Sequence, residues 1–251
     1  MGIDMKFNCT YRVGIEEIGH DHKASLKAMV TFLEDSACWH SATVGYGIKE
    51  VETKHRAWVV LDWKIKVIEY PEYQEEFTVS TWSRHMDGIR AFRDYEMRGA
   101  DGRLIATGSS KWIFTDTERR RPVRLTDDIN ELYGTEPDMA MDEEIEELIY
   151  DEALFENGYT TQYVVTRRDI DVNKHVHNIN YIDIAYDAMP EEIYSKFVMG
   201  GFTQLHILYK KEIKLGDTVT CKYIEQNGHH TIALLVDNKI KEGYIKLLKF
   251  K

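Results

Sequence analysis

The sequence predicts an α+β protein built from two similar units in tandem, each a long helix wrapped by an antiparallel sheet. Three observations support this fold class. The 251 residues are 43% hydrophobic, enough for one large core or two ordinary ones. A strongly acidic window divides the chain into two segments. In both segments a helical periodicity is followed by several strand-like runs, an order that is typical of α+β proteins.

Each segment is expected to begin with a short strand, at residues 11–18 and 163–170. A helix should follow each strand. In the first segment apolar residues recur at three- and four-residue steps over 26–44, as on the buried face of a helix. In the second segment the same spacing covers 179–189, and Pro190 is expected to end the helix.

Both segments then change to β patterns. The expected strands are 58–70, 75–85, 91–99 and 103–116 in the first segment, and 204–215, 216–226, 231–237 and 244–250 in the second. The dipeptides Asp87-Gly88 and Asn227-Gly228 favour two-residue hairpin turns, because Asn and Gly adopt positive φ readily. Each helix would then be wrapped by one curved antiparallel sheet.

The acidic window, residues 126–158, is expected to be a linker between the two units. It holds thirteen Asp or Glu and no Lys or Arg, while the whole chain has a net charge of −11. The rest of the chain is therefore slightly basic. We expect an N-terminal unit at 1–125 and a C-terminal unit at 159–251. Periodicity at 145–149 favours a helix near the end of the linker, which should pack across both units.

Composition and charge exclude several classes of protein. The N-terminus lacks the features of a signal peptide, no apolar run could span a bilayer, and Lys6 breaks the myristoylation pattern. Cys9, Cys38 and Cys221 are odd in number and far apart, as expected of reduced thiols. No broad basic stripe is present to bind nucleic acid. We expect a cytoplasmic protein with neither membrane insertion nor a nucleic-acid partner.

Residues 171–178, DVNKHVHN, place polar residues at alternate positions, Asp171, Asn173 and His175. Alternate side chains of an extended segment point to the same side, so these three should converge just before a helix. An amide and a helix N-terminus can hold a developing oxyanion, and an imidazole can transfer a proton near neutral pH. The group suits attack on a polarised acyl carbon. Asp and Asn are also common in turns and caps, so these residues alone leave both interpretations open.

The two segments can be aligned on Tyr11 and Tyr163. The three polar residues then fall opposite Gly19, Asp21 and Lys23. Only the C-terminal unit has the full set. We therefore expect a single active centre there, with the N-terminal unit left to shape a pocket.

The segment that begins at Asp171 resembles the Asp-x-Asn-x-His-Val-x-Asn segment of bacterial and plant acyl-ACP thioesterases. These are double hot-dog enzymes that release fatty acids from acyl carrier protein (ACP). Residues 56–73, 79–97 and 104–125 are similar, in the same order, to strands of this family and its Arg-rich tail. The resemblance covers most of both units. It implies a tandem hot-dog fold and hydrolysis of fatty acyl-ACP to free fatty acid and ACP.

The resemblance also implies a role for Glu212, in a later strand. The acidic catalytic residue of the family lies in a Tyr-x-x-Glu context, which Tyr209 supplies here. The family often has Cys directly after that Glu, but this chain has Ile213, so a thiol nucleophile is not expected. Glu212 would activate water with His175, Asn173 would hold the carbonyl oxygen, and Asp171 would hold the network together. The implied catalytic residues are Asp171, Asn173, His175 and Glu212.

Two further sets of residues are candidates for contacts with the substrate. A fatty acyl chain needs a long apolar pocket, expected between helix and sheet of the N-terminal unit and lined by Met29, Leu33, Trp58 and Trp63. A basic cluster could steer an acidic carrier protein, although it could also be a solvated strand end. It consists of Arg119, Arg120, Arg121 and Arg124.

Other functions remain open from the sequence. His175 and His177 could form a metal site with Asp171, but no third ligand has suitable spacing, so we expect no metal and no cofactor. An enoyl hydratase would need Pro where Val176 lies. An acyl-CoA thioesterase and a non-catalytic acyl-binding module are also compatible with the sequence. Chain-length preference and the choice between monomer and homodimer are not predicted.

Overall fold

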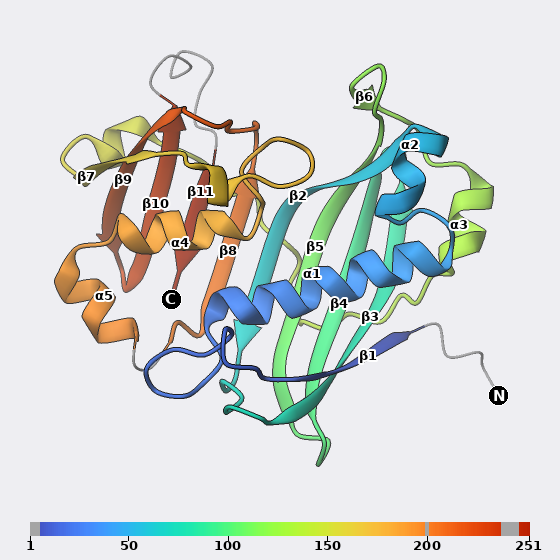
Figure 1. The fold of residues 1–251 in the computed structure, drawn as a ribbon, viewed down its shortest axis with the longest axis horizontal. Coiled ribbons are helices and arrows are strands. Elements are labelled where there is room, and N and C mark those ends of the chain that lie inside the picture. Colours follow the sequence, from blue (N-terminus) through green and yellow to red (C-terminus); the bar gives the residue numbers. More distant parts are fainter. Residues whose placement is uncertain (1–5, 199–200, 237–245) are drawn as a thin grey trace.

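The computed structural model describes residues 6–198, 201–236 and 246–251. Within these residues one continuous antiparallel sheet of eleven strands spans the molecule (Figure 1). Along the sheet the strands are β1 (Phe7–Arg12), β3 (Glu76–Asp87), β4 (Arg90–Gly99), β5 (Leu104–Asp116), β2 (Arg56–Val67), β8 (Gln204–Tyr209), β11 (Lys246–Phe250), β10 (His229–Val236), β9 (Thr218–Gln226) and β7 (Tyr159–Val164), and β6 (Arg121–Pro122) pairs with β5. The order of β8 to β7 mirrors that of β2 to β1, so two equivalent sheets meet edge to edge.

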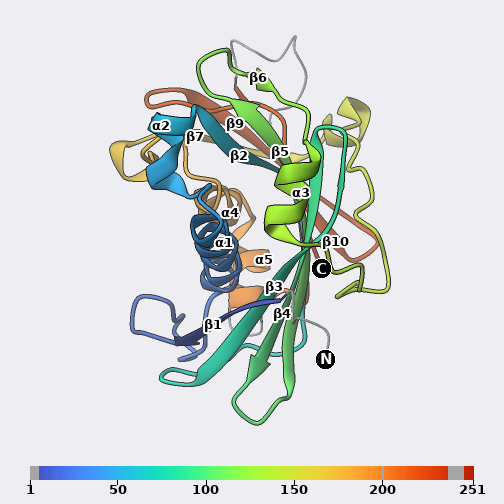
Figure 2. The ribbon, with the colours of Figure 1, turned by 90° about the vertical axis from the view of Figure 1, so that its right-hand side faces the viewer.

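Apart from the short helix of the acidic linker, which lies beside β3, the helices of both units lie on the same face of this sheet (Figure 2). The helices are α1 (Leu26–Thr43), α2 (Val51–Lys54), α3 (Asp127–Tyr133), α4 (Asn180–Asp187) and α5 (Glu191–Val198). Helix α1 starts where predicted, because the side chain of Ser25 accepts the Ala28 N–H at 3.1 Å and so caps the first turn. Its apolar stripe packs on the N-terminal strands.

Helix α4 of the C-terminal unit forms within the predicted range 179–189 and stops before Pro190 as expected, and a second helix, α5, follows it. Helix α4 has eight residues and ends at Asp187, and α5 has another eight. Pro190 lies between them, where its ring prevents a helix from continuing. The two units therefore share a sheet topology but not a helix length.

Most predicted strands are present, with shifted ends. The first strand of each unit lies earlier in the chain than predicted, at Phe7–Arg12 rather than 11–18 and at Tyr159–Val164 rather than 163–170. The strand expected over 204–215 ends at Tyr209. The Asn227-Gly228 turn is confirmed, with φ of 54° and 72°. Residues 237, 244 and 245 of the last predicted strands lie outside the described residues.

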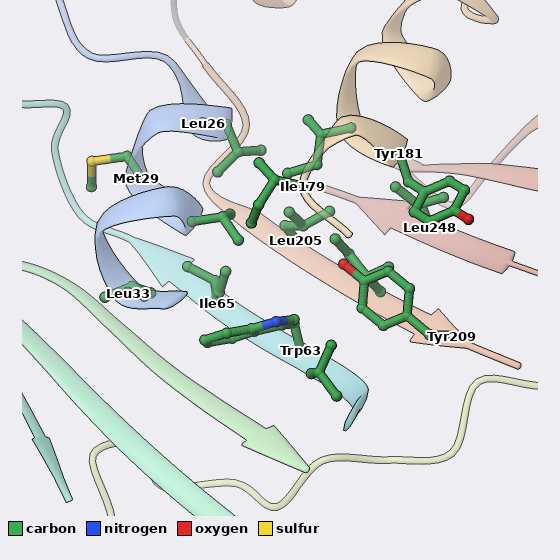
Figure 3. Packing of buried hydrophobic residues seen from close by; sticks show 14 of the residues in the cluster. Leu26, Met29, Leu33, Trp63, Ile65, Ile179, Tyr181, Leu205, Tyr209 and Leu248 are labelled. Carbon is green, nitrogen blue, oxygen red and sulfur yellow. The ribbon is translucent and has the colours of Figure 1, made fainter. Parts of the chain in front are cut away.

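The two units are joined by antiparallel pairing of β2 with β8, in which Lys64 lies opposite His206. Figure 3 shows the core above this junction, where side chains from α1, the β2–β8 pair and the segment leading into α4 meet. On the opposite face, Nε2 of His206 lies 2.7 Å from Oδ1 of Asp62, and both residues are buried. A buried contact between a carboxylate and an imidazole thus bridges the two units.

The acidic linker crosses the face of the sheet opposite the helices. After α3, residues 134–151 contain neither helix nor strand, so the helix expected near 145–149 does not form. Glu143 pairs with Lys64 at 2.6 Å, and Glu144 pairs with Arg84 at 2.7 Å. These contacts hold the segment along basic side chains of the sheet, which explains how so acidic a stretch can remain ordered without secondary structure.

Candidate active site

A tight turn brings the predicted polar residues of the C-terminal unit together. Oδ1 of Asp171 accepts the backbone N–H of Asn173 at 2.8 Å, and Oδ2 accepts the Asn173 side-chain amide at 3.2 Å. The Asp171 N–H donates to the His175 carbonyl at 2.9 Å, and Lys174 has a φ of 65°. The residues therefore converge through a side-chain-stabilised turn and not through the extended segment that alternate spacing predicted.

The turn does not lead directly into a helix. Helix α4 begins at Asn180, five residues after His175, and its N-cap residue Ile179 makes no side-chain capping bond. The expected placement of the polar group at a helix N-terminus is therefore not seen. The chemistry available at this site comes from the turn itself.

Glu212 lies against His175. Oε2 of Glu212 is 2.9 Å from Nε2 of His175. Glu212 is three residues beyond the end of β8, in the segment that connects β8 with β9, and so is not in a strand as expected. The Val176 N–H donates to the Ile213 carbonyl at 2.9 Å, which fixes this segment against the turn. The Glu212 side chain is 45% exposed, so water can reach its carboxylate.

A second basic group holds the same carboxylate. Nη2 of Arg120, from the N-terminal unit, lies 2.8 Å and 3.1 Å from the two carboxylate oxygens of Glu212. All four arginines predicted to steer a carrier protein are exposed, and Arg120 also contacts Glu212 at the polar centre. The sequence gives no signal for this contact, because the two residues are 92 positions apart.

The turn of the C-terminal unit has a counterpart in the N-terminal unit. The Gly19 N–H donates to the Lys23 carbonyl at 2.9 Å, as Asp171 does to His175. His22 has a φ of 61°, close to that at the matching position of the other turn. The backbones of the two turns are therefore alike. The turns differ in their side chains, since the polar residues Asp171, Asn173 and His175 occur in the C-terminal turn.

The segments that lie beside the two turns also match. The Ala24 N–H donates to the Pro71 carbonyl at 2.8 Å. In the same way the Val176 N–H donates to the carbonyl of Ile213, the residue after Glu212. The position that corresponds to Glu212 is held by Tyr70, whose hydroxyl donates to the Phe202 carbonyl at 2.7 Å. The N-terminal unit thus keeps the backbone of the site but lacks its carboxylate, amide and imidazole.

His177, which was left out of the predicted catalytic set, makes a different contact. Its Nε2 lies 3.4 Å from Oε2 of Glu34 on α1. This hydrogen bond with Glu34 raises the pKa of His177, against the lowering effect of burial. The imidazole therefore ties the polar turn to the helix of the other unit. No group of three or more His, Cys, Asp or Glu that could hold a metal ion occurs among the described residues.

The four residues predicted to line an acyl pocket lie between α1 and the N-terminal sheet. Met29, Leu33 and Trp63 are buried in the core, near the junction of the units (Figure 3). Nε1 of Trp58 donates to the Tyr133 hydroxyl at 2.7 Å. A cavity of about 470 Å³ lies elsewhere, on the opposite face beneath the acidic linker, and none of the four residues lines it.

Comparisons with solved structures identify the fold class. The 12:0-ACP thioesterase from Umbellularia californica matches with a TM-score of 0.83 and 18% identity, over 100% of this chain and 98% of that one. An acyl-ACP thioesterase from Bacteroides thetaiotaomicron also matches with a TM-score of 0.83 and 18% identity, over 98% and 97% of the two chains. The continuous sheet with its helices on one face is that of a double hot-dog protein.

Comparison of the sequence with models of protein families identifies the family. The acyl-ACP thioesterase N-terminal domain matches residues 4–133, and the C-terminal domain of the same family matches residues 152–247. The chain belongs to the acyl-ACP thioesterase family.

Curated relatives agree with this placement. Oleoyl-acyl carrier protein thioesterase 2 of Arabidopsis thaliana, a chloroplastic protein, is 26% identical over 233 residues, which is 87% of this chain and 63% of the relative. A dodecanoyl-[acyl-carrier-protein] hydrolase of Cinnamomum camphora, also chloroplastic, is 24% identical over 261 residues, which is 98% of this chain and 66% of the relative. The chain thus spans about two thirds of the length of these relatives. Among the described residues, no helix is long and apolar enough to cross a bilayer.

Proposed function

We propose that this protein hydrolyses the thioester of a fatty acyl-ACP to give free fatty acid and ACP. The observation that carries the proposal is the 2.9 Å contact between Glu212 and His175, beside a turn that also holds Asp171 and Asn173. Membership of the family supports the choice of an acyl-ACP substrate. The names of the relatives, which are ACP thioesterases and hydrolases, support it as well.

In the proposed mechanism Glu212 and His175 together activate a water molecule. The carboxylate takes a proton from water while the oxygen attacks the thioester carbon, and the His175 imidazole passes that proton on to the departing thiolate as the C–S bond breaks. One amide hydrogen of Asn173 bonds to Asp171, so the other is left to donate to the carbonyl oxygen. Asp171 holds this turn in shape and does not contact the substrate.

Release of free thiol from a panel of acyl-ACP and acyl-CoA substrates tests the proposal. We expect kcat/KM for the preferred acyl-ACP to exceed that for the matching acyl-CoA by at least about tenfold, a ratio set by contacts with the carrier protein. The panel would also show the preferred chain length. Intact thioester after incubation would instead indicate an acyl-binding module, and hydration of an enoyl thioester would indicate hydratase chemistry on the same fold.

We also propose that the exposed arginines near the polar centre steer the carrier protein. Because Arg120 contacts Glu212, the cleaner test reverses the charge of Arg121 and Arg124, which are both exposed. The double variant is expected to raise KM for acyl-ACP by about tenfold at low salt, since acidic partners are attracted by long-range charge. The measurement is KM as a function of ionic strength.

A matched control separates steering from damage to the site. Arg12→Glu reverses an exposed charge on β1, at the far edge of the N-terminal sheet, and should leave KM for acyl-ACP unchanged. A neutral acyl-pantetheine should be hydrolysed at the wild-type rate by the Arg121 and Arg124 variant. An unchanged KM for acyl-ACP in that variant would remove the docking role.

The proposed setting is fatty acid synthesis in the cytoplasm, with a monomer or a homodimer as the active form. The three cysteines are free, and Cys9 and Cys221 are buried, which suits a reducing compartment. The chloroplastic relatives work in a different compartment, as their names state. Sedimentation of the purified chain would distinguish monomer from dimer.

A further inference from the structure

We infer that Lys246 is a positioning residue for Glu212, which it serves by holding the backbone segment that carries this carboxylate. The inference rests on the proposed function of Glu212. Lys246 is the first residue of β11, and its side chain lies on the helix face of the sheet, as do those of Leu248 and Phe250 in the same strand. No motif in the sequence marks this lysine.

The ammonium of Lys246 is enclosed within the fold. The residue is only 4% exposed, and its Nζ donates to the backbone carbonyl of Lys211, directly before Glu212. The aromatic rings of Tyr181 and Tyr209 face it, with centroids at 5.0 Å and 5.3 Å. These contacts suit a cation, because aromatic faces and a carbonyl oxygen all present negative charge.

The segment around Glu212 is thus held from both sides. The Lys211 carbonyl accepts from Lys246, and the Ile213 carbonyl accepts from Val176 of the polar turn. Hydrogen bonds to the carbonyls of the residues before and after Glu212 thus restrict the backbone that carries its carboxylate. A shift of about 1 Å in a catalytic group can lower a rate about 100-fold, so such anchoring has a direct effect on hydrolysis.

Comparison of the two units shows that the fold itself does not require this lysine. Tyr209, the last residue of β8, lies opposite Lys246. In the N-terminal unit the matching strand end is Val67, and the residue opposite it is Ala106. The unit without catalytic side chains therefore has a small apolar residue where the unit with Glu212 has a buried cation.

Burial of a charged amine is unfavourable, and the structure shows what compensates for it. Burial lowers the pKa of Lys246 to about 7, and the negative charge of Glu212 acts in the opposite direction. The other titratable groups that face the amine are the phenols of Tyr181 and Tyr209, whose pKa values are raised by burial and which stay neutral. Among these described neighbours, Glu212 is the acidic group whose negative charge favours the charged form of Lys246. The buried ammonium is therefore coupled to the proposed catalytic carboxylate.

The test compares Lys246→Met with Lys249→Met. Both residues are on β11, but Lys249 lies on the opposite face and lines the cavity beneath the linker. We expect Lys246→Met to lower kcat for acyl-ACP about 10- to 100-fold with KM changed less than about twofold, because the carboxylate is displaced and the substrate contacts are kept. Lys249→Met should match the wild type, and Lys246→Arg should recover most of the lost rate.

The pH dependence distinguishes positioning by a charge from simple packing. The ratio of wild-type to Lys246→Met kcat should be largest at pH 6 and fall towards pH 9, because the amine loses its charge as the pH rises through about 7. A purely structural role would give a constant ratio. A folded Lys246→Met protein with wild-type kcat at pH 6, or a constant ratio, would overturn the inference.

Amide hydrogen exchange provides a readout that does not depend on turnover. The Val176 N–H, which donates to Ile213, should exchange at least about tenfold faster in Lys246→Met than in wild type or Lys249→Met. Faster exchange in a protein that hydrolyses no acyl-ACP would support the anchor and reject the proposed function. Normal exchange in an active enzyme would reject the anchor alone.

Discussion

Replacing Glu212 with glutamine is expected to lower kcat for acyl-ACP by about 100- to 10,000-fold, the range that a general base contributes. Glutamine has nearly the same shape but cannot accept a proton from water. The contact with His175 at 2.9 Å and the bond to Arg120 can both be kept by the amide oxygen. KM should therefore change little, and the loss should appear in single-turnover rates.

Glu76→Gln is the matched control for this variant. Glu76 is an exposed glutamate on β3 that also pairs with an arginine, Arg12, but lies far from the polar turn. It should leave kcat unchanged, which shows that loss of a paired surface carboxylate alone has no effect on turnover. Should folded Glu212→Gln retain more than about a tenth of wild-type kcat, another group must activate the water.

Removing the carboxylate of Asp62 is expected to give the largest loss of stability. Asp62 is 2% exposed and lies 2.7 Å from Nε2 of His206, across the junction of the two units. Asp62→Ala leaves the imidazole buried without its partner and should lower the free energy of unfolding by about 3–5 kcal/mol. Chemical denaturation monitored by tryptophan fluorescence would measure this, since Trp63 is the next residue along β2.

A double variant tests the reason for that loss. In Asp62→Leu with His206→Leu both polar groups are replaced by apolar ones, so no buried group is left unpaired and the loss should be clearly smaller than in Asp62→Ala. The same pair of changes made at the exposed contact of Arg12 with Glu76 should alter stability by less than about 1 kcal/mol. Equal losses in Asp62→Ala and in the double variant would show that packing, and not the unpaired imidazole, determines the effect.

The sequence was sufficient to predict the two-unit α+β fold, because apolar periodicity and turn dipeptides are local signals. The Asn227-Gly228 hairpin formed as expected. The alignment of the units on Tyr11 and Tyr163 also places the two turns in register, as their matching backbone bonds show. Strand ends were less predictable, because the 204–215 pattern continues beyond the point where β8 loses its partner strands.

The candidate site was predictable only where its residues are close in sequence or carry a family motif. Asp171, Asn173 and His175 form a local turn, and Glu212 came from the resemblance. Contacts that depend on the meeting of distant segments gave no local signal. Arg120 reaches Glu212 from the other unit, and Lys246 on the last strand donates to the Lys211 carbonyl beside it.

The continuous sheet has a consequence for how two copies of one fold can specialise. In a symmetric dimer, a contact across the twofold axis is repeated, so a residue that suits one subunit must also suit the other. Joining both copies in one polypeptide removes that constraint. The acid can then come from β2 alone and the imidazole from β8 alone, as in the Asp62–His206 pair. Covalent fusion thus permits an asymmetric boundary that a twofold-symmetric dimer of identical chains could not have.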